Sequence, residues 1–124
     1  MSEIHIKRIY ELPNDEDGFR ILVDRLWPRG VKKDSANIDL WAKEIAPSNE
    51  LRQWFGHDPE RFAKFSELYR EELAAHPKAT GFLDHVKAVL SKGNVTLLYG
   101  ARDTVYNHAT VLKNWIEEKM SETN

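Results

Sequence analysis

The sequence predicts an α/β fold, with a small and mostly parallel sheet, an N-terminal hairpin and a cover of about five helices. Two short apolar runs, at residues 21–23 and 95–99, have the unbroken hydrophobic character of strands that are covered on both faces. Several amphipathic stretches with helical spacing lie between these runs. An order of strand, helices, strand and helix implies a right-handed crossover, so we expect residues 19–27 and 95–99 to be neighbouring parallel strands.

Two strands are expected near the N-terminus. Residues 4–10 alternate apolar and polar side chains, which is the period of a half-buried strand. Residues 19–27 contain the first apolar run. The acidic turn at residues 13–18 is too short for a helical crossover, so it predicts that these two strands form an antiparallel hairpin.

Capping residues mark the helices in the middle of the chain. Ser48 fits the N-cap of a short helix that Gly56 ends. Asp58 and Pro59 fit the start of the next helix, and apolar stripes predict two more helices after it. Residues 38–45 fit a helix or a strand equally well.

The same periodicities predict the core and the extent of the domain. The bulky side chains expected in the core are Trp41, Trp54, Phe62, Phe65 and Leu98. The chain of 124 residues fits one domain, so we expect residues 1–120 to form it and residues 121–124 to be a frayed tail.

Composition excludes several classes of function. The chain has no cysteine, which rules out thiolate catalysis and cysteine-ligated zinc. The N-terminus has no signal-peptide pattern, and no apolar run approaches the roughly 20 residues that span a bilayer, so we expect a cytoplasmic protein with no membrane partner. The net charge of -2 gives no general reason to bind nucleic acid.

Polar residues that follow the apolar runs are the first candidates for a site, because ligands of parallel sheets bind beyond the carboxyl ends of the strands. Asp24, Arg25 and Arg29 follow the first run. The planar guanidinium of arginine suits a carboxylate or a phosphate. The alternative is structural, since Asp24 could pair with an arginine and simply hold the loop.

The second run is followed by Arg102, Asp103 and Thr104, and then by Asn107 and His108. These residues open the last helix, where free backbone N–H groups attract anions. Asp103, Thr104 and Asn107 are each candidates for its N-cap. The helix dipole disfavours a charged imidazole at His108, which makes it a candidate proton donor or acceptor. The alternative is a packed or solvated helical histidine.

His57 is a third candidate, because it lies on a loop between two helices. Other site types find no match: there is no glycine-rich phosphate loop and no serine nucleophile elbow. The five histidines lack the spacing of metal ligands, so we expect no metal and no cofactor.

Four stretches of the chain resemble the YeaO-like family, part of a larger group of domains of unknown function. They are residues 21–30, 46–48, 54–59 and 97–109, the last without a match at positions 105 and 106. The resemblance runs over roughly residues 7–115. It implies no established activity.

The resemblance also bears on the start of the last helix. Related domains in the wider group carry a Cys-His-Arg triplet there. The matching residues here are Asn107, His108 and Ala109. The thiol and the arginine are missing, so the resemblance implies that cysteine-dependent chemistry is lost and only the histidine persists.

We therefore expect a domain that binds a small phosphate- or nucleotide-like anion, with His108 and Asp103 as the catalytic pair if it is an enzyme. The ligand-binding residues expected beside them are Asp24, Arg25, Arg29, His57, Arg102 and Asn107. The alternative is a non-catalytic interaction module that binds nucleic acid through a basic patch beside Trp27. The sequence leaves the oligomeric state and any protein partner open.

Overall fold

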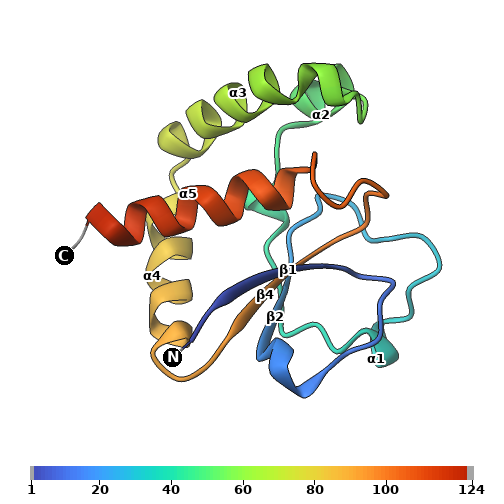
Figure 1. The fold of residues 1–124 in the computed structure, drawn as a ribbon, viewed down its shortest axis with the longest axis vertical. Helices are drawn as coiled ribbons and strands as arrows, with labels where there is room; N and C mark the ends of the chain where they lie inside the picture. The colour runs from blue at the N-terminus through green and yellow to red at the C-terminus, as the bar shows by residue number, and fades with distance from the viewer. Residues whose placement is uncertain (1, 123–124) are drawn as a thin grey trace.

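The computed structural model of the chain describes residues 2–122 and has one four-stranded parallel sheet (Figure 1). Its strands are β1 (Ile4–Arg8), β2 (Phe19–Leu22), β3 (Leu40–Trp41) and β4 (Val95–Tyr99), in the spatial order β1-β4-β2-β3. β4 pairs with both β1 and β2. The α/β class and the parallel pairing of the two buried strands are therefore confirmed.

The predicted N-terminal hairpin is wrong. β1 and β2 run parallel and lie on opposite sides of β4, so they do not touch as partners. Residues 9–18 connect them through a turn at residues 9–11 and a 3-10 turn, Asp15–Asp17, with no α-helix between. Ten residues reach at most about 33 Å when fully extended, roughly twice the length of a five-residue strand, so a connection that contains turns can still run back along the sheet. A parallel connection without a helix is thus possible. The absence of room for a helix between two strands therefore does not require an antiparallel hairpin.

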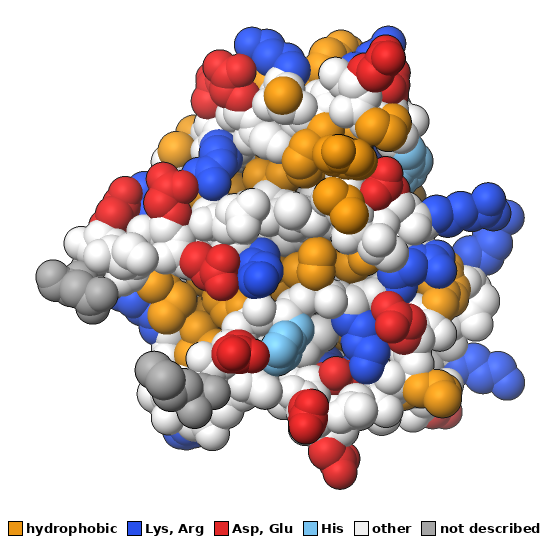
Figure 2. All heavy atoms as spheres, in the orientation of Figure 1, with side chains coloured by type: hydrophobic (Ala, Val, Ile, Leu, Met, Phe, Trp, Pro, Cys, Tyr) orange, Lys and Arg blue, Asp and Glu red, His pale blue; other side chains and the backbone are white. Residues whose placement is uncertain are grey.

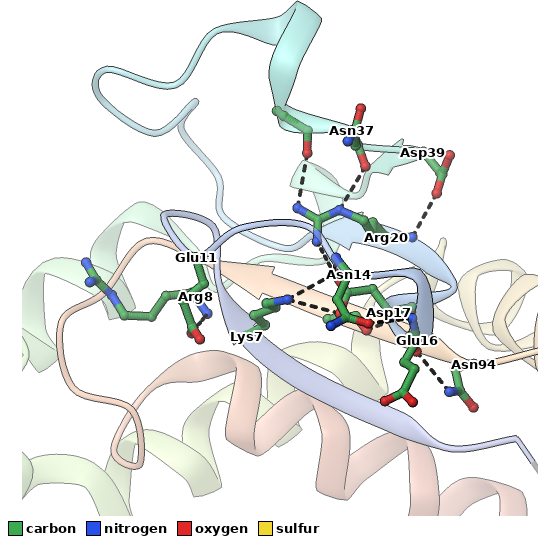
Figure 3. Close-up of polar contacts among 12 residues, drawn as sticks. Lys7, Arg8, Glu11, Asn14, Glu16, Asp17, Arg20, Asn37, Asp39 and Asn94 are labelled. Atoms are coloured by element: carbon green, nitrogen blue, oxygen red, sulfur yellow. Dashed lines mark hydrogen bonds and ion pairs between the residues drawn. The ribbon is translucent and has the colours of Figure 1, made fainter.

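The returning segment is fastened by Asp17, whose side chain is buried (Figure 3). Its carboxylate accepts hydrogen bonds from Lys7 Nζ at 3.1 Å, from the backbone N–H of Asn14 at 3.0 Å and from Arg20 Nη1. Arg20 also donates to the carbonyl oxygen of Ala36. Burial alone raises the pKa of the Asp17 carboxyl, but these donors outweigh it and hold the pKa below its ordinary value.

Helices cover one face of the sheet much more heavily than the other. The helices are α1 (Lys33–Ala36), α2 (Asn49–Phe55), α3 (Phe62–Ala75), α4 (Ala79–Leu90) and α5 (His108–Glu122). The last four pack on one face, and α1 with its flanking loops lies against the other (Figure 1).

The two faces explain why the central strands are mostly apolar. Ile21, Val23 and Leu97 point into the large core beneath helices α2 to α5. Leu22 and Leu98 point into a smaller cluster on the opposite face. Adjacent side chains of a strand alternate between faces, so a strand buried on both sides is hydrophobic at most positions. Arg20 on β2 and Thr96 on β4 are the buried polar exceptions.

The remaining sequence expectations have mixed outcomes. Phe65 and Leu98 are buried as predicted, but Trp54 is 40% exposed, because the short helix α2 turns Leu51 and Phe55 to the core instead. The stretch at residues 38–45 contains both a strand, β3, and a 3-10 turn.

The C-terminal helix reaches further than the domain boundary expected from the sequence. α5 includes Ser121 and Glu122, and the other two residues of the expected tail lie outside the described part of the chain. Within residues 2–122, no helix has the length and hydropathy to cross a membrane.

Candidate functional site

A pocket of about 250 Å³ lies where the chain leaves the two central strands. After β2 the chain turns to the face that carries α1, and after β4 it turns to the face that carries α5. Adjacent parallel strands whose connections depart to opposite faces leave a crevice between them, and α/β proteins bind their ligands there. The position of the pocket therefore agrees with the edge of the sheet that the sequence indicates.

The lining comes from the loops that follow β1, β2 and β4 and from the first residue of α5. Pro47, the helix α2 with its following turn, and Phe65 on α3 complete it. The lining residues are Tyr10, Asp24, Arg25, Leu26, Trp27, Pro28, Pro47, Arg52, Phe55, His57, Phe65, Gly100, Ala101, Asn107 and His108. Serine, threonine, cysteine and lysine are missing from this set.

Asp24 and His108 meet on one wall. Asp24 Oδ2 accepts a hydrogen bond from the backbone N–H of Gly100 at 2.9 Å, which ties the end of β2 to the end of β4. Asp24 Oδ1 lies 2.8 Å from His108 Nε2, and both side chains are 18% exposed. This distance is that of an ion pair, although the contact lacks regular hydrogen-bond geometry, and neither atom has a hydrogen-bond partner elsewhere among the described residues. Both atoms are buried against each other, so this contact lies within the wall of the pocket.

The loop before α5 is shaped by two side chains. Asn107 is the N-cap of the helix, since its Oδ1 accepts from the backbone N–H of Thr110 at 3.0 Å. Asp103 accepts from the backbone N–H groups of Tyr106 and Val105, both at 2.9 Å. These two bonds hold the pKa of the Asp103 carboxyl below its ordinary value. Asp103 does not line the pocket, and its contacts are those of a loop-forming residue.

Arg25 forms a cationic part of the wall. Its Nε donates to the carbonyl oxygen of Pro47 at 3.0 Å, and its Nη2 donates to that of Ala46 at 3.1 Å. These bonds join the end of β2 to the segment before α2 and fix the guanidinium. They use two of its five N–H donors and leave its charge uncompensated by any carboxylate hydrogen bond.

Arg29 and Arg102 are not brought together with Arg25. Both are exposed, and neither lines the pocket. The backbone carbonyl of Arg29 accepts from the hydroxyl of Tyr10 at 3.0 Å. A role for these two arginines in binding a ligand stays a prediction.

His57 lines the pocket from the turn between α2 and α3. Its φ of 58° lies in the left-handed region, directly after Gly56 with φ 54°. Few non-glycine residues adopt this conformation, and those that do cluster at functional sites. Its ring lies beside that of Phe55, with 6.3 Å between the ring centroids.

Arg52 and Tyr10 are two lining residues with polar side-chain groups that the sequence analysis does not predict. Arg52 lies on α2, three residues before Phe55, so helical spacing from a core aromatic could have placed it on this side. Tyr10 follows β1 at the same edge of the sheet. The predicted antiparallel hairpin would place the end of β1 at the opposite edge of the sheet, so it gives no reason to expect Tyr10 here.

The pocket thus combines two guanidinium groups and two imidazoles with one carboxylate, from Asp24. Such a set suits an anion, and the contact between Asp24 and His108 would orient the imidazole for proton exchange. Among the described residues, no group of three or more His, Cys, Asp or Glu side chains is placed to hold a metal ion.

Comparisons with known proteins cover nearly the whole chain. The family profile that matches residues 3–124 is described as the inactive DUF488-N3 subclade. "Uncharacterized protein YeaO" of Escherichia coli is 45% identical over 113 residues, which is 91% of this chain and 96% of that protein. "Uncharacterized protein Mb3100c" of Mycobacterium bovis and "Uncharacterized protein Rv3073c" of Mycobacterium tuberculosis are each 40% identical over 111 residues, 90% of this chain and 91% of theirs. No solved structure matches the chain.

Proposed function

The chain belongs to the inactive DUF488-N3 subclade, in agreement with its YeaO-like sequence, and we propose that it is a non-catalytic domain that binds a small anionic molecule. The ligand occupies the pocket at the carboxyl ends of β2 and β4. The observation that favours binding over group transfer is that the subclade is described as inactive. The cytoplasmic location expected from the sequence remains part of this proposal.

The observation that carries the proposal is the guanidinium of Arg25. It is fixed in the wall by two backbone carbonyls, which satisfy hydrogen bonds without cancelling its charge. A preorganised guanidinium binds a phosphate or carboxylate with little loss of side-chain entropy. Arg52, His57 and His108 line the same pocket, so a phosphorylated metabolite or a nucleotide fits its charge.

The contact between His108 and Asp24 favours a second candidate, an enzyme. His108 would act as general acid or base, and Asp24 would orient its ring. Release of inorganic phosphate from AMP by the wild-type protein, and its loss in His108→Gln, would favour this candidate over simple binding.

Thermal melts with added inorganic phosphate or AMP test the proposal. Either ligand, if bound, stabilises the folded protein by about 2.7 kcal/mol at a hundred times its Kd, which raises Tm. We expect Arg52→Ala to reduce the rise, because Arg52 lines the pocket. Arg102→Ala is the matched control: Arg102 is also an exposed arginine but lies outside the lining.

Each melt is compared with sodium chloride at the same ionic strength, which separates binding from screening. We expect Arg102→Ala to melt within about 0.5 kcal/mol of wild type and to keep the full rise. The proposal is wrong if neither anion raises Tm beyond the salt control, or if both variants reduce the rise equally.

A further inference from the structure

Large hydrophobic side chains are exposed around the mouth of the pocket. Those exposed in the described part of the chain are Tyr10, Leu12, Leu26, Trp54, Val105 and Tyr106. All of them lie on segments that leave β1, β2 or β4 at the carboxyl ends, or on α2, which lines the same pocket. Figure 2 shows hydrophobic side chains at the surface beside α2 and the start of α5. This end of the sheet is therefore unlike the rest of the surface.

Two of the exposed rings form cation–π contacts with an arginine guanidinium. The Arg61 guanidinium lies 5.4 Å from the ring centroid of Trp54, and Arg61 also donates to the backbone carbonyl of Trp54. The Arg8 guanidinium lies 5.0 Å from the ring of Tyr10. Trp54 is 40% exposed and Tyr10 is 48% exposed, so both rings keep surface on which a further planar group can stack.

The charge of this end differs from that of the whole chain. We define the rim as residues 8–12, 24–33, 52–61 and 101–107, which surround the pocket. The rim contains eight Lys or Arg residues and five Asp or Glu residues, although the net charge of the whole chain is -2. Figure 2 shows Lys and Arg side chains projecting at the edge of the molecule where these loops lie.

The acids of the rim are largely engaged within the protein. Asp24 and Asp103 bond backbone N–H groups, as described above, and Asp58 accepts from the backbone N–H of Glu60 and lies 3.7 Å from Arg61 Nε. In contrast, no acidic side chain among the described residues pairs with Arg29 or Arg102. The rim therefore presents unpaired positive charge next to exposed aromatic rings.

We propose that the rim binds single-stranded nucleic acid, which passes over the mouth of the pocket. Unstacked bases stack on Trp54 and Tyr10, and backbone phosphates contact Arg29 and Arg102. This function goes beyond the binding of a small anion, because Trp54, Arg29 and Arg102 lie outside the pocket lining and only Tyr10 of these four residues belongs to it. Exposed rings recognise bases only where these are unpaired, so a duplex of the same length is the weaker ligand.

Fluorescence anisotropy with a labelled oligothymidylate of about twelve nucleotides tests the proposal. The wild-type protein is expected to bind, with an affinity that falls about tenfold or more between about 50 and about 200 mM NaCl. Trp54→Ala weakens binding about tenfold, because one stacking contact is lost. Arg102→Glu weakens binding as well. It does not make the salt dependence of the affinity steeper, because a phosphate contact is lost. Both changes are at exposed side chains, so melting curves should match the wild type.

Arg70→Ala is the control, since Arg70 lies on α3 and pairs with Glu118, away from the rim. It should bind as the wild type does. The rim proposal is overturned if no binding occurs at about 50 mM NaCl, or if Trp54→Ala and Arg102→Glu both bind like Arg70→Ala. A rise of Tm with inorganic phosphate in a protein that does not bind the oligonucleotide would overturn the rim proposal alone and leave the pocket proposal standing.

Discussion

Asp17 is the residue on which the N-terminal half of the fold depends most. It joins Lys7 on β1 to Arg20 on β2, although these two strands do not pair with each other. The backbone carbonyl of Asp17 also accepts from the hydroxyl of Thr96 on β4 at 2.7 Å. One short turn therefore ties three strands together.

Asp17→Asn is expected to cost about 3–5 kcal/mol, because it leaves the buried Arg20 without a carboxylate. Urea denaturation measures the loss. Asp15→Asn is the control: Asp15 belongs to the same 3-10 turn but is exposed, and its replacement should change stability by less than about 0.5 kcal/mol. Equal effects of the two changes would show that the buried contacts of Asp17 carry little stability.

The sequence predicts the site residues unevenly. Asp24, Arg25, Asn107 and His108 line the pocket, and each follows a recognisable strand or opens a helix, where the backbone fixes the direction of the side chain. Their role in binding a ligand stays a prediction. Arg102 lies in the loop that Asp103 shapes, where the direction of a side chain depends on hydrogen bonds that no periodicity reveals.

Among the elements, the crossover between β1 and β2 has the tightest local geometry. Gly18 has a φ of 65°, and a Cβ at this position would lie 2.1 Å from the backbone oxygen of Asn94. The same oxygen accepts from the N–H of Phe19 and so begins the pairing of β2 with β4. Only glycine fits the approach of these two backbones.

Gly18→Ala is therefore expected to destabilise the protein by about 2–4 kcal/mol, from backbone strain and a steric clash. Gly81→Ala is the matched control, and its effect on the free energy of unfolding should have the opposite sign. Gly81 lies within α4 with open space around its Cα, so alanine there should stabilise by about 0.5–1 kcal/mol. Denaturant melts of both variants measure the difference. A Gly18→Ala protein as stable as wild type would contradict the close approach.

The elements themselves are predicted better than their pairing. Capping by Ser48 and Asp58 and the apolar run of β4 are local signals, and the structure has those elements at those places. The hairpin fails because strand order is decided by which strand fills the centre of the sheet. β4 takes that position, and nothing within the first 28 residues could indicate it.

For the molecule as a whole, stability should fall in alkali. Burial raises the pKa of the Tyr69 hydroxyl far above its ordinary value of 10.0, while in the unfolded chain it ionises near that value. A group whose pKa is raised on folding stabilises the protein below the unfolded pKa, and this contribution is lost as pH rises above it. One such group removes up to about 1.4 kcal/mol per pH unit above pH 10.

Tyr69→Phe should make this fall shallower. The change also removes the hydrogen bond from the Tyr69 hydroxyl to the carbonyl oxygen of Ile45, at a cost of about 1–3 kcal/mol at neutral pH. Urea denaturation between pH 8 and pH 11 would follow both effects, with the exposed Tyr10→Phe as the control. An unchanged slope in Tyr69→Phe would show that other groups cause the alkaline loss.

The central position of β4 also has a consequence for the order in which the protein can fold during synthesis. β1 and β2 emerge first, but each pairs with β4, whose residues are made only after three-quarters of the chain. Until then the two early strands have no shared partner, and the helices made between them and β4 have no complete sheet to pack on. The nascent chain must therefore keep its apolar segments from aggregating through most of translation, and its native sheet closes in a late step as β4 inserts between strands that were made long before it.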